Sequence, residues 1–258
     1  MRFTKMHGAG NDYVYVDVFD QSVEDAPAVA RAVSDRHAGI GGDGLILMAP
    51  SDTADVRMIM YNADGSRAQM CGNGIRCLAA LARSRGRVGS DTVRVATDDG
   101  IKVVTLTDGG ARVDMGAPRV GETLSVRGLQ LTCVSMGNPH AVVYVDDVET
   151  FDVHGVGAAL ENDRERFPER VNVSFVQVLD RGRVLQRTWE RGSGETQACG
   201  TGACAVCVAG VATGRTDNTL SSRLPGGTLV LEWDGAGSVF MTGPAVEVFS
   251  GEWRGDGV

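Results

Sequence analysis

The sequence of 258 residues is poor in lysine, in aromatic residues and in basic charge. Lys5 and Lys102 are its only lysines, which argues against chemistry that starts from a Schiff-base lysine, including that of pyridoxal phosphate. Aromatic residues make up 5%, too few for a base-stacking surface. The 33 acidic residues outnumber the 25 basic ones, and the arginines are scattered. The composition therefore excludes a basic nucleic-acid-binding stripe.

Long apolar runs are also missing. No stretch approaches the ~18 apolar residues of a membrane span, and the start, MRFTKMHGAGNDY, lacks the apolar core of a secretory signal. We therefore expect a cytoplasmic protein without a membrane partner. In that compartment a disulfide framework is not expected. The six cysteines are Cys71, Cys77, Cys133, Cys199, Cys204 and Cys207.

The second half of the chain repeats the first. Cys71-Gly-Asn-Gly opens an apolar, alanine-rich stretch, and Cys199-Gly-Thr-Gly opens a similar stretch in the second half. Asn11 and Asn138, separated by almost the same distance in sequence as the two cysteines, both follow a glycine and precede a β-branched run that ends in aspartate. Matches in one order at nearly one spacing predict a duplicated domain. We expect the first domain to span residues 1–116, joined by 246–258, and the second to span 117–245.

Short β-rich runs separated by Gly, Asp and Asn predict that each half consists mostly of strands. Helices are expected over 26–36, with Asp25 as N-cap and Pro27 in the first turn, and over 155–166. The alanine-rich stretches after the two cysteines predict one buried central helix per half. The predicted fold is α+β, with two pseudo-symmetric domains of mostly antiparallel strands wrapped around a central helix. The active site is expected in the cleft between them.

Cys71 and Cys199 each precede a predicted helix. The positive end of the helix dipole and its unpaired N–H groups stabilise a thiolate, so both thiols are expected to titrate well below ~8.5. The neighbouring glycines let backbone N–H groups approach an anion such as a carboxylate. One thiolate and one thiol on opposite faces of a carbon could remove a proton and replace it with inversion. The pattern therefore favours a racemase or epimerase.

The remaining candidate motifs favour structural roles. Cys204 and Cys207 form a CxxC inside the alanine-rich stretch, without a second CxxC or a histidine partner, so neither a redox centre nor a metal site is favoured. Together with Cys77 and Cys133 they are expected to fill the core. The glycines between 39 and 44 precede a predicted strand instead of a helix, which does not fit a dinucleotide-binding loop.

Six segments in order resemble the diaminopimelate epimerase family across almost the whole chain: KMHGAGNDYVYVD, YNADGSRAQMCGNGIRC, VSMGNPH, PERVNVSFV, WERGSGETQACGTGA and GPAVEVF. The resemblance implies two similar domains meeting at a cleft, and no cofactor or metal. It implies conversion of LL- to meso-2,6-diaminopimelate through two cysteines, for lysine and peptidoglycan precursor synthesis. It also implies a homodimer.

Residue by residue, the resemblance assigns proton transfer to Cys71 and Cys199 and adjustment of the thiol pKa values to His140 and Glu190. It assigns substrate binding to Asn11, Asn62, Gly72, Asn73, Asn138, Asn172, Glu190, Arg191, Gly200 and Thr201. A guanidinium suits a bidentate grip on the distal carboxylate. Asparagine amides suit a zwitterion because each carries a donor and an acceptor.

Two positions depart from the family pattern. Gly44 stands where the family often has glutamine, so a substrate contact there would need another group. Phe249 stands at a family interface tyrosine, so a hydroxyl hydrogen bond in the dimer would be lost. Other interpretations stay open: a proline or histidine racemase-like enzyme, or a non-enzymatic thiol-redox protein. Arg191 and the many asparagines argue against the racemase-like interpretations, whose smaller substrates would not need them. Matched thiols at two helix starts argue against a non-enzymatic protein.

Overall fold

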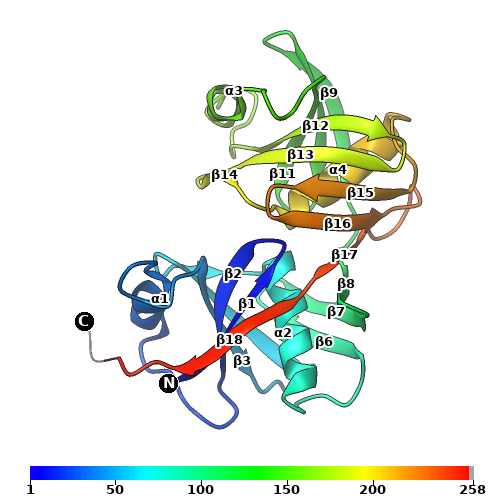
Figure 1. The fold of residues 1–258 in the computed structure, drawn as a ribbon. Coiled ribbons are helices and arrows are strands. Elements are labelled where there is room, and N and C mark those ends of the chain that lie inside the picture. Colours follow the sequence, from blue (N-terminus) through cyan, green and yellow to red (C-terminus); the bar gives the residue numbers. More distant parts are fainter. Residues whose placement is uncertain (256–258) are drawn as a thin grey trace. The chain divides into compact units, whose positions relative to one another are not determined.

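The computed structural model describes residues 1–255, so the last three residues of the expected C-terminal segment 246–258 lie outside it. The chain divides into two compact units (Figure 1). Unit 1 is Met1–Val113 together with the C-terminal segment that starts at Gly243, and unit 2 is Asp114–Thr242.

Unit 1 is a mostly antiparallel sheet. Its strands are β1 (Arg2–Gly8), β2 (Asn11–Asp17), β3 (Gly44–Ala49), β4 (Val56–Asn62), β5 (Arg67–Ala68), β6 (Thr92–Thr97), β7 (Gly100–Thr107), β8 (Gly110–Asp114) and β18 (Val246–Glu252). β1 pairs antiparallel with both β2 and β18. Two pairs run parallel, β2 with β3 and β4 with β6.

Two helices complete unit 1, α1 (Ala26–Ser34) and α2 (Gly72–Ser84). The predicted start of α1 is confirmed, because the Asp25 carboxylate accepts a hydrogen bond from Ala28 N at 3.2 Å. The helix ends two residues before the predicted position 36. The Asp35 carboxylate accepts from the N–H groups of His37 and Ala38, both at 2.7 Å, and this local turn competes with a further helical turn.

Unit 2 repeats this order. Its strands are β9 (Arg119–Val126), β10 (Leu129–Ser135), β11 (Pro139–Tyr144), β12 (Asn172–Asp180), β13 (Arg183–Glu190), β14 (Gly194–Thr196), β15 (Thr219–Leu224), β16 (Gly227–Glu232) and β17 (Phe240–Pro244), the last of which ends beyond the unit boundary. β11 runs parallel to β12, and β13 to β15, as β2 does to β3 and β4 to β6. The pairing pattern of one unit is therefore that of the other.

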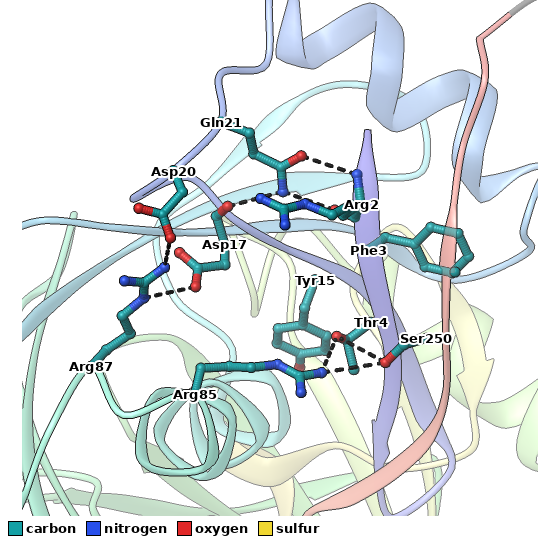
Figure 2. Close-up of a pocket in the computed structure, with 11 residues that line it drawn as sticks. Arg2, Phe3, Thr4, Tyr15, Asp17, Asp20, Gln21, Arg85, Arg87 and Ser250 are labelled. Carbon is teal, nitrogen blue, oxygen red and sulfur yellow. Dashed lines mark hydrogen bonds and ion pairs between the residues drawn. The ribbon is translucent and has the colours of Figure 1, made fainter.

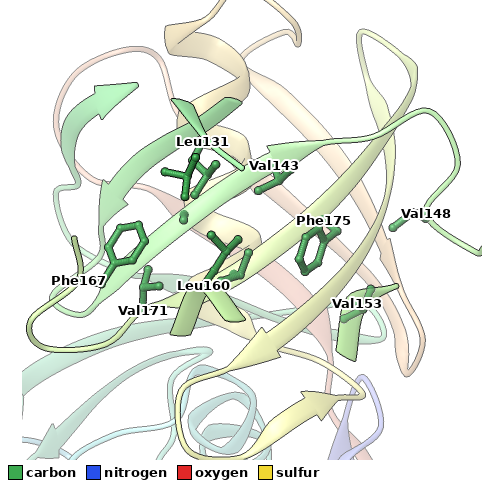
Figure 3. Close-up of a cluster of buried hydrophobic side chains, with 11 residues drawn as sticks. Leu131, Val143, Val148, Val153, Leu160, Phe167, Val171 and Phe175 are labelled. Atoms are coloured by element: carbon green, nitrogen blue, oxygen red, sulfur yellow. The ribbon is translucent and has the colours of Figure 1, made fainter. Parts of the chain in front are cut away.

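The helices of unit 2 are α3 (Val153–Glu161) and α4 (Gly200–Ala212). The predicted helix 155–166 is shifted, because it starts where Asp152 accepts from Gly155 N at 2.8 Å and ends before Asn162. There the Asn162 amide donates to Ala158 O at 2.8 Å, and Asp163 turns the chain by binding Arg166. Leu160 of α3 packs with Leu131, Phe167 and Phe175 into the apolar cluster of Figure 3.

The helices that follow the two cysteines are confirmed, with Cys71 and Cys199 as N-caps. In α4 every residue from Gly202 to Gly210 is buried, as expected for a helix that is apolar on all sides. α2 is also largely buried, and each helix lies against the strands of its own unit (Figure 1). The predicted α+β class, a duplicated domain of mostly antiparallel strands around a central helix, is confirmed.

Candidate active site

One face of β2 contacts the start of α2. Successive side chains of a strand point to opposite faces, so Asn11, Tyr13 and Tyr15 share one face. The Cys71 thiol donates to Asn11 Oδ1 at 3.3 Å, and the Tyr13 hydroxyl donates to Cys71 Sγ at 3.8 Å. The Tyr15 hydroxyl donates to the carbonyl of Gly74 at 3.0 Å. The alternation of side chains along β2 thus brings the Asn11 amide and the Tyr13 hydroxyl within hydrogen-bonding distance of the Cys71 sulfur.

A charged network sets the orientation of Asn11. Its Nδ2 donates to Asp43 Oδ2 at 2.6 Å, which turns Oδ1 toward Cys71. Arg36 bridges Asp12 at 2.7 Å and Asp43 at 3.0 Å. Lys5, which is buried, binds Asp12 at 2.6 Å and also the carbonyl of Gly41. Burial acts to raise the pKa of Asp12, but hydrogen bonds from Arg36 and Lys5 outweigh it and hold that pKa below its usual value.

The first turn of α2 completes this half of the site. Gly74 N donates to Cys71 Sγ at 3.4 Å, and Asn73 Nδ2 lies 3.5 Å from Asn11 Oδ1. Gly72 is buried in the same turn. The structure therefore brings Asn11, Cys71, Gly72 and Asn73 together at a helix N-terminus, where N–H groups and the helix dipole favour an anion.

Asn62 and Gly44 face each other in the register of β3 and β4. The Asn62 amide donates to Ser66 Oγ at 3.0 Å. A Cβ added at Gly44 would lie 2.2 Å from the carbonyl oxygen of Tyr61 and 3.1 Å from Cε1 of Tyr13. A side chain at position 44 would thus require the backbone to shift, so the departure from the family's glutamine is built into the strand geometry of this chain.

Unit 2 gathers its predicted residues around Cys199. Asn138 Nδ2 lies 3.5 Å from Thr201 Oγ1, and Asn138 Oδ1 is 3.0 Å from His140 Nε2. Thr201 Oγ1 lies 3.7 Å from Cys199 Sγ, and Gly200 is buried at the start of α4. Side chains from the β10–β11 turn and from β11 therefore meet the first turn of α4.

The expected low pKa of Cys199 is wrong. Burial is the largest effect and raises the pKa of this thiol well above its ordinary value, and the charge and hydrogen bond of Glu190 raise it further. The N–H of Gly202 and the Thr201 hydroxyl act in the opposite direction but are outweighed. Burial also lowers the pKa of His140 to about 3, aided by the positive charge of Arg191. At neutral pH Cys199 is a thiol and His140 an uncharged imidazole.

Glu190 and Arg191 lie at the end of β13 and in the turn that follows it. Thr196 Oγ1 donates to Glu190 Oε1 at 2.5 Å. The exposed Arg191 side chain donates from Nη1 to the carbonyl of Glu169 at 2.8 Å. Asn172 is buried and uses its amide on backbone, donating to Pro139 O at 2.9 Å and accepting from Arg191 N at 3.0 Å. In this state Asn172 ties the Arg191 turn to β11.

A buried carboxylate that the sequence did not single out holds the same turn. Glu161, at the end of α3, is 3% exposed. It accepts from Gly192 N at 2.8 Å and from Trp189 Nε1 at 2.7 Å, and it forms an ion pair with Arg170. Glu161 thereby fixes the backbone directly after Glu190 and Arg191. No local motif marks it, because Trp189 and Gly192 are distant from it in sequence.

Tyr13 and Asp43 were also missed. Tyr13 follows Asn11 by two positions, as His140 follows Asn138, so the duplication could have identified it. Asp43 has no comparable signal, since it lies in a glycine-rich stretch that is typical of a turn. Its contact with Asn11 arises from the parallel pairing of β2 and β3.

A cavity of about 390 Å³ in unit 1 contains none of the predicted site residues (Figure 2). Two arginines that line it are already paired: Arg87 binds Asp17 at 2.9 Å, and Arg85 donates to Thr4 Oγ1 at 3.1 Å.

Within residues 1–255, no group of three or more His, Cys, Asp or Glu side chains could hold a metal ion. None of the helices described is long and apolar enough to cross a membrane.

Sequence comparison relates the chain to one family throughout. The profile of the family described as diaminopimelate epimerase matches residues 3–121 and 132–248. A diaminopimelate epimerase of Desulforudis audaxviator is 51% identical, with 98% of this chain and 99% of that protein covered. One of Acetivibrio thermocellus is 49% identical, with 98% of each covered.

Solved structures share the fold at low sequence identity. A phenazine biosynthesis protein of the PhzF family from Bacillus anthracis is 15% identical with a TM-score of 0.77, over 97% of each chain. A probable proline racemase from Agrobacterium radiobacter is 16% identical with a TM-score of 0.73, over 99% of this chain and 93% of that one. At this distance the likeness concerns the fold alone, so it does not favour the proline racemase alternative.

Proposed function

The chain belongs to the diaminopimelate epimerase family, and from that membership and the two thiol sites we propose that Cys71 and Cys199 carry out its reaction. The protein is an isomerase that acts on diaminopimelate, a small-molecule substrate. The observation that carries the proposal is the repeated geometry: in both units a cysteine caps a helix start, with an asparagine from the matching strand or turn beside it.

In the proposed reaction, the Cys71 thiolate removes the proton from Cα, breaking the C–H bond and forming S–H. The electron pair passes into the substrate carboxylate, and the Cys199 thiol delivers its own proton to the opposite face of the same carbon. The configuration is inverted, Cys71 ends as thiol and Cys199 as thiolate, and the reverse reaction uses that state. Burial and Glu190, which keep Cys199 protonated, support its role as the acid in the first direction.

The carboxylate next to the reacting carbon needs donors because negative charge accumulates on it after proton removal. We propose that the N–H groups of Gly72, Asn73, Gly200 and Thr201 supply them at the two helix starts. The amides of Asn11, Asn62 and Asn138 would receive the substrate's ammonium and carboxylate groups. His140 is uncharged and hydrogen bonded to Asn138, so it would hold that amide in place. It would adjust the surroundings of Cys199 without placing a positive charge there.

The distal end of diaminopimelate carries a second ammonium and a second carboxylate. We propose that Arg191, with Asn172 and Glu190 beside it, binds this end. The support is that the Arg191 side chain is exposed at a turn whose backbone is held by Asn172 and Glu161. A guanidinium can then bind the carboxylate through two parallel hydrogen bonds.

Replacement of the cysteines tests the reaction scheme. Cys71→Ser and Cys199→Ser should each abolish the conversion of LL- to meso-diaminopimelate, measured in the absence of added cofactor. An alcohol is a far weaker acid than a thiol, so serine can neither supply the anionic base at position 71 nor donate the proton that Cys199 delivers. Cys133→Ser, at a half-buried thiol outside both sites, is the control and should keep wild-type turnover. Retention of more than about a tenth of the turnover, ~1.4 kcal/mol, by either site variant would refute the two-thiol scheme.

We also propose that the enzyme works in the cytoplasm, in the synthesis of lysine and peptidoglycan precursors, as a homodimer. Support for self-association comes from β18, whose side chains are exposed along its whole length. Val248 and Phe249 leave about half of their surface uncovered there, at 54% and 47%. Apolar surface of this kind on an edge strand favours burial against a second chain.

A further inference from the structure

The duplication relates each residue around Cys199 to a position around Cys71. At two of these positions, 13 and 44, the residue type differs from that of its counterpart in unit 2. The spacing that relates Asn11 to Asn138 also relates Tyr13 to His140. Tyr13 lies two residues after Asn11 on the same face of β2, and His140 lies two residues after Asn138, which belongs to the turn before β11. His140 reaches the Asn138 amide, whereas Tyr13 reaches the sulfur of Cys71 itself.

Gly44 makes room for this contact. The spacing that relates Cys71 to Cys199 relates Gly44 to Asn172, which fills its place in unit 2 with a buried amide. In unit 1 the position has no side chain, and its ideal Cβ would approach Cε1 of Tyr13 to 3.1 Å. The Tyr13 ring, 5% exposed, thus occupies space beside β3 where a side chain at position 44 would clash with it.

We propose that the Tyr13 hydroxyl is a catalytic hydrogen-bond donor to Cys71, which stabilises the thiolate whenever this cysteine acts as the base. This rests on the proposed function, since it assumes that Cys71 exchanges a proton with the substrate. The sulfur has an acceptor in Asn11 Oδ1 for its thiol form, at 3.3 Å. Gly74 N at 3.4 Å and Tyr13 Oη at 3.8 Å are donors for its thiolate form. Both protonation states are therefore hydrogen bonded.

Tyr13 stays a donor throughout the cycle because it does not give up its proton. Burial is the main cause that raises its pKa well above the ordinary value, and the negative charges of Cys71 and Asp43 add to it. Tyr15 and Cys77 also lie near the sulfur, and burial raises the pKa of both. Asp43 is the nearby anion, and Arg36 neutralises part of its charge.

The test is the pH dependence of alkylation of Cys71 by iodoacetamide, followed at this residue by peptide mass spectrometry in wild type and Tyr13→Phe. The loss of a donor worth ~1 kcal/mol should slow alkylation by about five- to tenfold at neutral pH and leave the rate at the alkaline plateau unchanged. In deuterium exchange, kcat should fall by a similar factor and KM should hardly change, because Tyr13 binds the sulfur and not the substrate.

Tyr15→Phe is the matched control. It removes an equally buried hydroxyl from the same strand, but one that donates to the Gly74 carbonyl instead of the sulfur. It should leave the alkylation profile unchanged. If Tyr13→Phe does not fold, Tyr13→Met keeps an apolar side chain without the hydroxyl and should show the same slowing at neutral pH.

An alkylation profile in folded Tyr13→Phe that matches wild type would overturn the proposal, and so would an equal shift in Tyr15→Phe, which would indicate general loosening. These outcomes are independent of the cysteine test. If Cys71→Ser is inactive and Tyr13→Phe behaves as wild type, the proposed function stands and the role of Tyr13 falls. If Cys71→Ser is active, the proposed function itself is wrong.

Discussion

Glu161 offers a sharp test of how the Arg191 turn is held. In Glu161→Gln the shape is kept, but one carboxylate oxygen becomes an NH₂ group. That group then faces a donor, either Gly192 N–H or Trp189 Nε1–H, and Arg170 loses its anion. Breaking a buried ion pair costs about 3–5 kcal/mol. Since the Arg170 side chain is 33% exposed and can regain water, the low end, ~3 kcal/mol, is expected.

The measurement is urea unfolding followed by the fluorescence of the tryptophans, two of which, Trp189 and Trp233, lie in unit 2. Amide hydrogen exchange at Gly192 provides a local readout, because this N–H then faces either the new NH₂ group or a neutral amide oxygen in place of the carboxylate, and it should exchange faster in both cases. The looser turn should also lower kcat/KM for diaminopimelate, since Arg191 precedes Gly192 directly. Alkylation of Cys71, which belongs to the other unit, should not change.

Adding Arg170→Met to Glu161→Gln provides the control, because it removes the cation that the first change leaves without an anion. The double variant should recover part of the stability lost in Glu161→Gln, so the two effects should be far from additive. Full additivity, or a loss below ~0.5 kcal/mol in Glu161→Gln, would refute the idea that a charged, desolvated contact holds this turn.

Two further predictions concern charged groups elsewhere in the site. Arg191→Met should lower kcat/KM for diaminopimelate by on the order of 100-fold, ~3 kcal/mol, and leave proton exchange with short monocarboxylic amino acids nearly unchanged; an equal loss on both substrate types would mean that Arg191 supports the fold and not the distal end. The lowered pKa of Asp12 should stabilise the folded protein above about pH 4 and lose that contribution as the pH falls through the folded-state value. In Asp12→Asn, the midpoint of urea unfolding should therefore fall less steeply as the pH is lowered from neutral to acidic values. An unchanged pH dependence would show that the contacts with Lys5 and Arg36 do not lower the pKa of Asp12.

The local features of this protein could be predicted from the sequence because each depends on neighbouring residues. Asp25 caps α1 through an N–H three residues away, and the glycines after Cys71 and Cys199 open helices that lie wholly within their own segments. The duplication was visible for a related reason, since copies of one fold keep the same turns and helix starts in the same order.

The ends of α1 and α3 were less predictable, because Asp35 and Asn162 each offer the backbone a competing local hydrogen bond that the apolar pattern does not reveal. The contacts that orient the site side chains were not predictable at all. Asp43 meets Asn11 through the pairing of β2 with β3, and Glu161 meets Gly192 through the packing of α3 on β13.

The acidity of Cys199 shows most clearly what tertiary structure decided. From the sequence, a cysteine at a helix start predicts a stabilised thiolate, and the helix start is indeed there. The fold then buries this sulfur and brings Glu190, from the end of strand β13, next to it. Loss of water and a neighbouring negative charge both disfavour the thiolate and exceed the effect of the helix N–H groups, so the thiol keeps its proton.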